Sequence, residues 1–598
     1  MEFQEPASCS NLEEPINKFI SAFQTGDYVV LGLVLAISAC IGLFFAFKDR
    51  KKSNEVYTMG GGEVSPYPIA LSLATTFFSS ITILGTPIEF YRFGTMFFYF
   101  SITYLICCIL AAEFFGPMYK KFNLTSMYEY LELRYNRFVR LVATAEFIVQ
   151  TVFYVGVVIY TPALALEAVS GLNVWAGVWL TGGVCIFYTA LGGLKAVVWT
   201  DSFQIVCMFG GLFAIIGKGF SSNGGYDLMI SEWREGGRNV WDDFSFDPRV
   251  RHTFWSIVIG GVLGNWGNSF CTSQAFVQRM LATKDIKDMR KAIYTCWVFA
   301  TGMQCVVALF TGIVVYSYFK CCDPEKAGFV ENKDSLLPYL TVEIFKDYPG
   351  VAGLYVAGAF SGTLSTASSG INSMSTCIVT DFLQPVLKLK ERTWMILSKF
   401  IALAIGLCCI AFAYIAANLG GVLQAAMSIN SMLGGPTTAL FVLSFFNPWV
   451  GPATAVISYL AGIGMAVWVF VGSKIYPPRP EFSKQMHLEV SGCNLTNYEP
   501  CEPDSSGVYP DVPWCDAPMD SERPGIASLY EVSYMWLGTI GFFTTVIIGC
   551  LLSLIPRLRP KRLKEGVLHP FVEKRYRGAQ YIPKCENQQE KHEKTEKI

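Results

Sequence analysis

The sequence predicts an all-α membrane protein that crosses the bilayer about thirteen times. Of its 598 residues, 52% are hydrophobic and only 16% are charged, and the mean hydropathy is +0.39. A soluble fold of this length would need a more polar composition. Apolar runs near the length that spans a bilayer, about 20 residues, recur along the chain. We place them at 28–47, 66–90, 95–118, 141–168, 174–194, 200–220, 253–280, 292–319, 350–380, 394–416, 420–446, 450–473 and 532–555.

The same composition argues against several function classes. The formal net charge is −1 and no basic stripe is present, so we expect no nucleic-acid partner. The sequence has no paired CxxC, no HExxH and no P-loop, and its four histidines are scattered. No nucleophile, base and orienting group recur together, so we do not expect an enzyme.

Basic residues beside the apolar runs predict the orientation. They cluster at 48–52, 120–140, 279–291 and 557–564, and with thirteen spans all four clusters fall on one side. Because cytoplasmic loops are enriched in Lys and Arg, that side is the cytoplasm, the N-terminus is outside and the C-terminus is inside. The predicted parts are an extracellular N-terminus (1–26), a transmembrane domain (27–555), an extracellular loop within it (474–531) and a cytoplasmic tail (556–598). We expect a multi-pass protein of the plasma membrane.

The large outward loop supports this orientation. Asn494 begins an N-glycosylation sequon there, and Cys493, Cys501 and Cys515 share the loop, which would lie in oxidising space. A second sequon at Asn123 falls on the predicted cytoplasmic side and should stay unused. Three cysteines cannot all pair within the loop. One of them could bond to Cys321 or Cys322 in another outward loop or stay free, and the sequence leaves the pairing open.

The apolar stretch from Phe360 to Asp381 is crowded with small hydroxyl residues. They occupy more than one face of a helix, so they cannot all bond to their own helix's carbonyls in a lipid-facing span. Hydroxyl oxygens beside a Gly carbonyl are ligands that a hard cation such as Na⁺ accepts. Close helix packing is the competing explanation for any single hydroxyl. The residues are Ser361, Thr363, Ser365, Thr366, Ser368, Ser369, Ser373, Ser375 and Thr376.

Two other apolar runs are interrupted by polar residues and glycines. Near its middle, the second run has a cluster of hydroxyl residues from Thr75 to Thr82. Gly85 and Pro87 follow the cluster, and Glu89 and Arg92 come after them. The seventh run contains glycines and polar residues, including amides, over 260–274. Broken helices at matching places in two halves point to a transporter built from inverted repeats. We place the core repeats at about 66–220 and 253–446. An ordinary proline kink, with Glu89 and Arg92 as a surface ion pair, is the alternative.

Five motifs resemble one known family. LGTPIEFYRFG in the second run, TALGGLKAVVWTDSFQ at 189–204, QAFVQRMLA at 274–282, FSGTLSTASSGIN at 360–372 and GGVLQAAMSINSMLGGP at 420–436 resemble the sodium/solute symporter family. Within it, the branch of sodium-coupled monocarboxylate, multivitamin and iodide symporters is most similar, over about residues 27–560. The resemblance implies a LeuT-type fold of two inverted five-helix repeats, with one helix before them and two after.

The resemblance also implies sites for Na⁺, the co-transported ion. The main site would use the backbone carbonyls of Thr75, Phe78 and Gly362 and the hydroxyls of Ser365 and Thr366. A further site seen in some members would use Asp201 with Ser368 and Ser369, and Ser79 as an additional member. Asp201 followed by Gln204 also has the pattern of a helix cap, and the sequence does not separate capping from ion binding.

The substrate pocket implied by the resemblance is an apolar and aromatic box with hydroxyl donors. Its members would be Thr82, Thr103, Trp266, Phe270 and Met427, although core packing is an alternative for the aromatic ones. This chain departs from the branch pattern YGVNQ, because it has Phe270-Cys-Thr-Ser-Gln274, and it has Ile88 where Ser is common. We expect a less polar pocket with no Arg or Lys inside it.

The leading functional hypothesis is therefore a sodium-coupled symporter in the lipid bilayer for small organic anions. Monocarboxylates such as lactate, pyruvate or short-chain fatty acids are favoured, because the resembling monocarboxylate carriers also have Thr at the positions of Thr82 and Thr103. A multivitamin (biotin or pantothenate) or iodide-type symporter is the alternative. A channel or sensor that binds sodium or solute without coupled transport is the alternative of another class.

Overall fold

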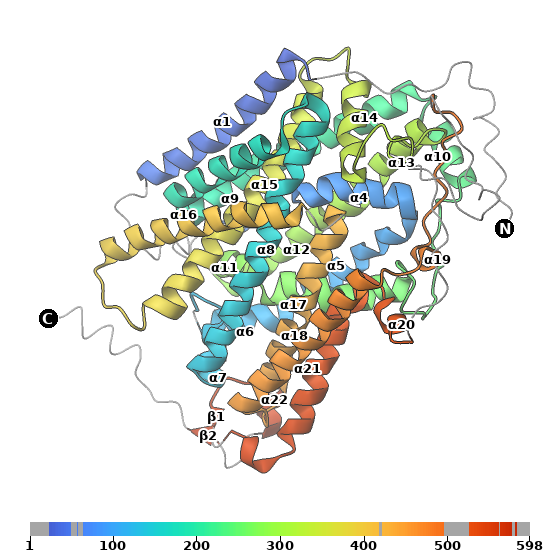
Figure 1. Ribbon diagram of the computed structural model, residues 1–598. Coiled ribbons are helices and arrows are strands. Elements are labelled where there is room, and N and C mark those ends of the chain that lie inside the picture. The colour runs from blue at the N-terminus through green and yellow to red at the C-terminus, as the bar shows by residue number, and fades with distance from the viewer. Residues whose placement is uncertain are drawn as a thin grey trace.

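The computed structural model describes residues 23–48, 57, 64–122, 124–417, 421–494, 525–560, 563–576 and 581–582. Within these ranges the regular structure is helical except for the strands β1 (Leu563–Lys564) and β2 (Tyr581–Ile582), which pair in parallel. Figure 1 shows the helices gathered into one bundle. The first half contains α1 (Thr25–Lys48), α3 (Pro66–Phe77), α4 (Ser80–Phe93), η2 (Thr95–Tyr99), α5 (Phe100–Ile109), η3 (Leu110–Phe115), α6 (Gly116–Lys121), α7 (Glu129–Arg134), α8 (Arg137–Ser170), α9 (Val174–Ser222) and α10 (Tyr226–Glu235).

The second half contains more irregular helix than the first. Its elements η4, η5, η6 and η8 are π-helical, whereas the first half has one π-helical element, η3, among the described residues. The elements of the second half are η4 (Ser256–Asn265), η5 (Asn268–Thr272), α11 (Gln274–Leu281), α12 (Ile286–Thr301), η6 (Gly302–Val307), α13 (Ala308–Phe319), η7 (Lys333–Ser335), α14 (Leu336–Ile344), α15 (Val351–Cys377), η8 (Ile378–Leu383), α16 (Glu391–Ala416) and α17 (Val422–Phe446). The chain then continues through α18 (Pro452–Ile475), α19 (Pro480–Ser483), α20 (Ala527–Tyr530), η9 (Tyr534–Trp536), α21 (Leu537–Ser553), η10 (Pro556–Leu558) and α22 (Pro570–Tyr576). Wide π turns suit helices that line a cavity, because they shift the register of the side chains that follow.

Nine helices in the described part of the chain are long and apolar enough to cross a membrane, and ten are if the bent pair α3 and α4 counts as one span. This finding confirms the polytopic membrane class. The full set of thirteen spans stays a prediction. The helix α15 is outside the nine because its hydroxyl residues lower its hydropathy, and Val174–Ala190 is a shorter apolar helix.

The two predicted runs at 174–194 and 200–220 form two helices that meet at a sharp bend at Gly193 and share the label α9. Gly193 has φ +64°, in the left-handed region that glycine occupies without penalty. The bend therefore replaces the loop that the spacing of the two runs suggests. Asp201 lies eight residues beyond the bend, inside the helix and fully buried, so the prediction that it caps a helix is wrong.

The hydroxyl-rich helix α15 is the centre of the bundle. Every residue from Tyr355 to Cys377 is buried, and α15 packs chiefly against α9, with α8, α1 and α3 also in contact. Figure 1 shows it among these helices, away from the surface formed by α18 and α21. A helix rich in Ser, Thr and Gly can be approached closely from every side. Its position brings its polar side chains to the break between α3 and α4.

Candidate functional site

The site begins where α3 ends and α4 starts. Phe78 (φ −90°, ψ 58°) and Ser79 (φ −66°, ψ 165°) leave the helical conformation, and the two helices are bent by 60°. A local hydroxyl bonds to the carbonyls at the break: Thr82 Oγ1 donates to those of Ser79 (2.8 Å) and Phe77 (3.2 Å). The break therefore occurs at the hydroxyl cluster, not at the Gly85–Pro87 segment. Gly85 and Pro87 lie inside α4, so the prediction that they break the second apolar run further along is wrong.

α15 presses its backbone against this break. A Cβ added at Gly362 would lie 2.5 Å from the Phe78 carbonyl oxygen and 2.9 Å from the Ser80 amide nitrogen, so only glycine fits. One turn further, Thr366 Oγ1 donates to the Thr76 carbonyl at 3.1 Å. On the same helix, Thr363 Oγ1 donates to Ser80 Oγ at 2.7 Å. The structure thus brings the hydroxyls and glycine of α15 to the irregular backbone of α3 and α4.

Several buried hydroxyls at this contact have no hydrogen-bond partner among the described residues. They are the Oγ atoms of Ser79, Ser361 and Ser365. A buried hydroxyl without a partner is costly, by roughly 1–3 kcal/mol, and native structures usually pair such groups. Oxygen ligands of this kind, together with the carbonyl of Phe78, suit a hard cation. Of the five residues predicted for the main Na⁺ site, Phe78, Gly362 and Thr366 therefore lie at this contact, with Thr75 and Ser365 next to them along α3 and α15, and ion binding by them stays a prediction.

Asp201, predicted for a further ion site, is engaged by a buried arginine. Arg279 Nη2 lies 3.5 Å from Asp201 Oδ2, and Ser72 Oγ donates to the same oxygen at 2.5 Å. Asp201 Oδ1 has no hydrogen-bond partner in the described structure. Ser368 and Ser369 donate their hydroxyl hydrogens to the Ser365 carbonyl, at 3.0 and 2.6 Å, and keep only lone pairs for other ligands.

Arg279 is a residue whose place the sequence did not indicate. The basic cluster 279–291 was assigned to a cytoplasmic flank, but Arg279 is only 1% exposed and inside the bundle. Besides Asp201, it donates to the Ser72 carbonyl at 3.2 Å and to Thr76 Oγ1. A guanidinium can be buried because it is paired with a carboxylate and hydrogen-bonded. The positively charged guanidinium of Arg279 therefore lies beside the site, although it does not line the cavity.

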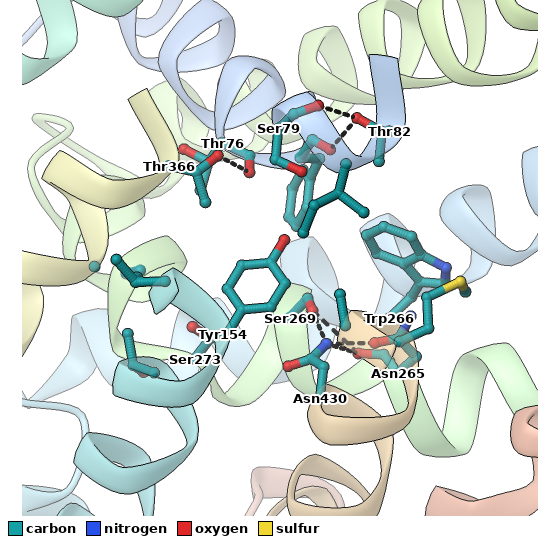
Figure 2. A pocket seen from close by; sticks show the side chains of 18 of the residues that line it. Thr76, Ser79, Thr82, Tyr154, Asn265, Trp266, Ser269, Ser273, Thr366 and Asn430 are labelled. Carbon is teal, nitrogen blue, oxygen red and sulfur yellow. Dashed lines mark hydrogen bonds between the residues drawn. The ribbon is translucent and has the colours of Figure 1, made fainter. Parts of the chain in front are cut away.

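A cavity opens beside the break, between α3, α4, α8, η4, α15 and α17 (Figure 2). Three of the five residues predicted for the substrate line it: Thr82, Trp266 and Met427. The other two do not. Thr103 Oγ1 donates to the Ile257 carbonyl at 3.1 Å, and Phe270 stacks behind the wall residue Phe77, with ring centroids 4.4 Å apart. Both pack behind the cavity surface in this structure, and a role for them in substrate binding stays a prediction.

The sequence missed a group of amides at the other end of the cavity. Gln150 Nε2 donates to Asn430 Oδ1 at 2.8 Å, and Asn430 Nδ2 donates to Asn265 Oδ1 and to Ser269 Oγ (3.0 Å). Figure 2 shows Tyr154 between this amide group and the break. The signal that could have found them is an isolated amide or phenol in an otherwise apolar run, because such residues are costly in a membrane.

The lining of the cavity is uncharged. Among the residues of the described chain that line it, none is Lys, Arg, His, Asp or Glu. The complete lining is Thr76, Phe77, Ser79, Ile81, Thr82, Gln150, Thr151, Tyr154, Val155, Asn265, Trp266, Ser269, Ser273, Ala275, Phe276, Gln304, Thr366, Gly370, Leu423, Ala426, Met427 and Asn430. An anion held here is met by hydroxyls, amides and any bound cation.

Ion pairs lie at the far end of α4. Glu89 accepts from Arg251 Nη2 at 2.9 Å, and Arg92 pairs with Glu325. Both Glu89 and Arg92 are buried, so the alternative of a surface pair between them is wrong. Burial, with the charge of Arg251 beside it, lowers the pKa of His252 to about 3, so this histidine is neutral near pH 7.

The outer-loop cysteines are partly described. Cys322 and Cys493 form a disulfide across 171 residues, and Cys321 is also disulfide-bonded. The sequence left the partner of Cys493 open, and the structure shows that it is Cys322. Cys501, Cys515, Asn123 and the sequon residues after Asn494 lie outside the described residues, so the glycosylation predictions are not addressed.

Comparisons with known proteins agree with this site. Residues 57–462 match the model of the sodium:solute symporter family. The chain is 42% identical to the sodium-coupled monocarboxylate transporter 1 of Xenopus laevis, over 92% of this chain and 88% of that protein. It is 37% identical to the human sodium/iodide cotransporter, over 89% and 83%. A solved Na⁺-coupled sialic acid symporter in a substrate-bound outward-open state superposes with a TM-score of 0.71 at 23% identity, covering 90% of this chain and 99% of that one.

Proposed function

Because this chain belongs to the sodium:solute symporter family, we propose that it carries small monocarboxylates such as lactate, pyruvate or short-chain fatty acids across the plasma membrane together with Na⁺. Membership confirms the resemblance that the five motifs predict. The chain is a sodium-coupled membrane transporter and not an enzyme.

The observation that carries the proposal is the contact between Gly362 and the broken span. It places hydroxyls that have no partner among the described residues, the Phe78 carbonyl oxygen and a cavity side by side. We propose that Na⁺ binds to the carbonyls of Thr75, Phe78 and Gly362 and the hydroxyls of Ser365 and Thr366. A further ion at Asp201, Ser368, Ser369 and Ser79 would compete with Arg279 for the Asp201 carboxylate. Binding there would use Oδ1, the oxygen without a hydrogen-bond partner.

An uncharged cavity limits how a carboxylate is held. Moving an anion out of water is costly unless charge or hydrogen bonds meet it. The polar side chains of the amide group line one end of this space, and Thr82, Trp266 and Met427 shape it. The bound Na⁺ supplies the charge that no lining side chain does, so substrate binds after Na⁺ and in proportion to its occupancy. The small apolar wall favours short monocarboxylates over larger vitamins.

The test is uptake into proteoliposomes that contain the purified chain. With an inward Na⁺ gradient, labelled lactate or butyrate accumulates above its outside concentration; with choline replacing Na⁺, it only equilibrates. A channel or sensor gives no uphill accumulation and contradicts the proposal. Competition by unlabelled biotin, pantothenate and iodide separates the alternatives, because the true substrate class displaces the label at the lowest concentration.

We also propose thirteen spans, with core repeats at about 66–220 and 253–446, the N-terminus outside and the C-terminus inside. The disulfide between Cys322 and Cys493 supports an oxidising side for both loops. Glycosidase treatment of cell-expressed protein should raise its gel mobility, and Asn494→Gln should remove this shift. A shift that survives Asn494→Gln and disappears with Asn123→Gln would reverse the orientation.

A further inference from the structure

A carboxyl group on α8, Glu146, lies in the bundle away from the ion-binding break. Its Oε2 atom accepts hydrogen bonds from Thr437 Oγ1 of α17 at 3.0 Å and from the Tyr459 hydroxyl of α18 at 2.9 Å. Its Oε1 atom is buried and has no hydrogen-bond partner in the described chain. The Glu146 carboxyl therefore joins three helices through one oxygen.

Glu146 differs from the carboxyls inside the bundle that face a guanidinium. Asp201 is paired with Arg279, Glu89 with Arg251, and Asp381 with Arg140. Glu146 has no ion pair with any described residue. The ionisable groups that face it are the phenols of Tyr459 on α18 and of Tyr128 just before α7. Thr437 is its polar neighbour on α17.

The oxygens around Glu146 can hold a proton with every hydrogen paired. Thr437 Oγ1 and the Tyr459 hydroxyl are 2.9 Å apart, and Thr437 also reaches the Leu433 carbonyl at 3.1 Å. When Glu146 is protonated on Oε2, it donates to Tyr459, Tyr459 donates to Thr437, and Thr437 donates to Leu433. An ionised Glu146 has no counter-charge to offset its desolvation, which is costly inside a membrane protein.

Glu146 is connected to the cavity through the contact of α8 with α17. Gln150, one turn along α8 and on the same face, donates to Asn430 at 2.8 Å, and Asn430 lies seven residues, or two turns, before Thr437. The Glu146–Thr437 and Gln150–Asn430 pairs are thus neighbouring rungs between the same two helices. An ionised Glu146 draws water to the Glu146–Thr437 pair, and this loosens the neighbouring Gln150–Asn430 pair, whose residues line the cavity.

We propose that Glu146 is a proton-binding site, occupied in the transport-competent form and emptied as pH rises, and that its ionisation lowers the affinity for substrate. This goes beyond the proposed function and uses transport as its readout. Neutral His252 does not account for such a pH response, because burial lowers its pKa to about 3.

The test compares wild type with Glu146→Gln in proteoliposomes at equal inside and outside pH, from 6.0 to 8.5. Butyrate is fully ionised over this range, so its own titration does not interfere. In wild type the apparent affinity for butyrate should fall several-fold toward pH 8.5. Glu146→Gln imitates the protonated carboxyl, so it should keep the affinity of the low-pH wild type at every pH. An unchanged alkaline fall in Glu146→Gln overturns the proposal.

Tyr459→Phe provides a second, opposite-direction test. It removes a donor to the ionised carboxylate, so the alkaline fall should move to higher pH. A move to lower pH, or no move in a variant that reaches the membrane, contradicts proton binding at Glu146.

A measurement without transport separates failure of this inference from failure of the proposed function. The melting temperature of purified wild type should fall relative to that of Glu146→Gln as pH rises. The reason is that a folded state that holds a proton more tightly than the unfolded state loses stability when that proton is removed. Parallel melting curves across pH 6.0 to 8.5 overturn the proposal whether or not uptake is observed.

Discussion

The two interruptions in the helical bundle differ in how their polar groups are satisfied. At the first, Phe78 and Ser79 separate α3 from α4, and the hydroxyls of Ser79 and Ser365 have no hydrogen-bond partner among the described residues. At the second, Ser273 (φ −101°, ψ 126°) separates η5 from α11, and the next side chain is hydrogen-bonded through both its oxygen and its nitrogen. Gln274 accepts from the Met127 amide at 2.8 Å and donates to the Thr125 carbonyl at 2.9 Å.

The difference shows that a broken helix is not by itself an ion site. Both interruptions free backbone groups, and both border the cavity, since Ser79 and Ser273 line it. At the second, the side-chain amide of Gln274 bonds to the backbone of the segment before α7 and ties α11 to that segment. The first keeps oxygen atoms available, as a site for a passing cation requires. We therefore assign ion binding to the first interruption and a structural role to the second.

The largest effect should come from Gly362→Ala. The added Cβ would collide with the backbone at Phe78 and Ser80, so α15 must move away from the break and the oxygen ligands separate. We expect Na⁺-driven uptake to be abolished. Gly210→Ala on α9 is the control, because its nearest neighbour would be Leu354 Cδ2 at 3.6 Å. Normal uptake by Gly362→Ala would show that close contact at the first break is not needed.

The sequence predicts the membrane class, the order of the helices and the contact of the hydroxyl-rich helix with the second apolar run. The membrane class and the helix order follow from hydropathy, and the hydroxyl-rich helix is recognised by its local density of Ser, Thr and Gly. The contact of that helix with the second run is implied by the resemblance to the symporter family. Of the residues predicted for the main ion site, Phe78, Gly362 and Thr366 lie at that contact. The family motifs and the chemistry of the hydroxyl residues point to the same contact, because both depend on the break in the backbone between α3 and α4.

The remaining features depend on contacts between distant segments. Nothing local indicates that Arg279 turns inward to Asp201, because its neighbours in sequence form a basic flank. Phe270 faces Phe77 instead of the cavity because π turns in η4 and η5 alter the register that a regular α-helix would give. The amide group from Gln150 to Asn430 is assembled from three helices, so no single motif contains it.

Removing the hydroxyl ligands tests the ion assignment with a smaller effect. Each hydroxyl in a dry site is worth about 1–2 kcal/mol, so Ser365→Ala or Thr366→Ala should raise the Na⁺ concentration for half-maximal uptake about ten-fold. The double variant should nearly abolish coupling. Ser375→Ala is the matched control, because that hydroxyl on the same helix donates to the Ser398 carbonyl in helix packing. Unchanged Na⁺ dependence in the double variant, at normal surface expression, would favour packing at the first break.

Gln274→Leu tests the structural role of the second interruption. Its loss leaves the Met127 amide and the Thr125 carbonyl without partners, which should lower the free energy of unfolding by about 1–3 kcal/mol. The melting temperature of purified protein measures this loss. The Na⁺ concentration for half-maximal uptake should stay the same. A large shift in Na⁺ dependence with unchanged melting would mean that the second interruption also holds the ion, and the contrast between the two would fail.

Thr82→Val should have the smallest effect and shows where the first interruption divides ion from substrate. The Thr82 hydroxyl lines the cavity, but its hydrogen is engaged by the carbonyls of Ser79 and Phe77. Only its lone pairs face the cavity, and a carboxylate needs donors, so direct contact with substrate is weak. Valine keeps the shape, and we expect the apparent affinity for butyrate to fall about three-fold, or less than 1 kcal/mol. The Na⁺ dependence of charge movement without substrate should stay the same. Thr82→Ser, which keeps the hydroxyl, should resemble wild type. If Thr82→Val instead changes that charge movement and spares the affinity for butyrate, the carbonyls that Thr82 holds are ion ligands, and the ion site extends further into α4 than Ser79.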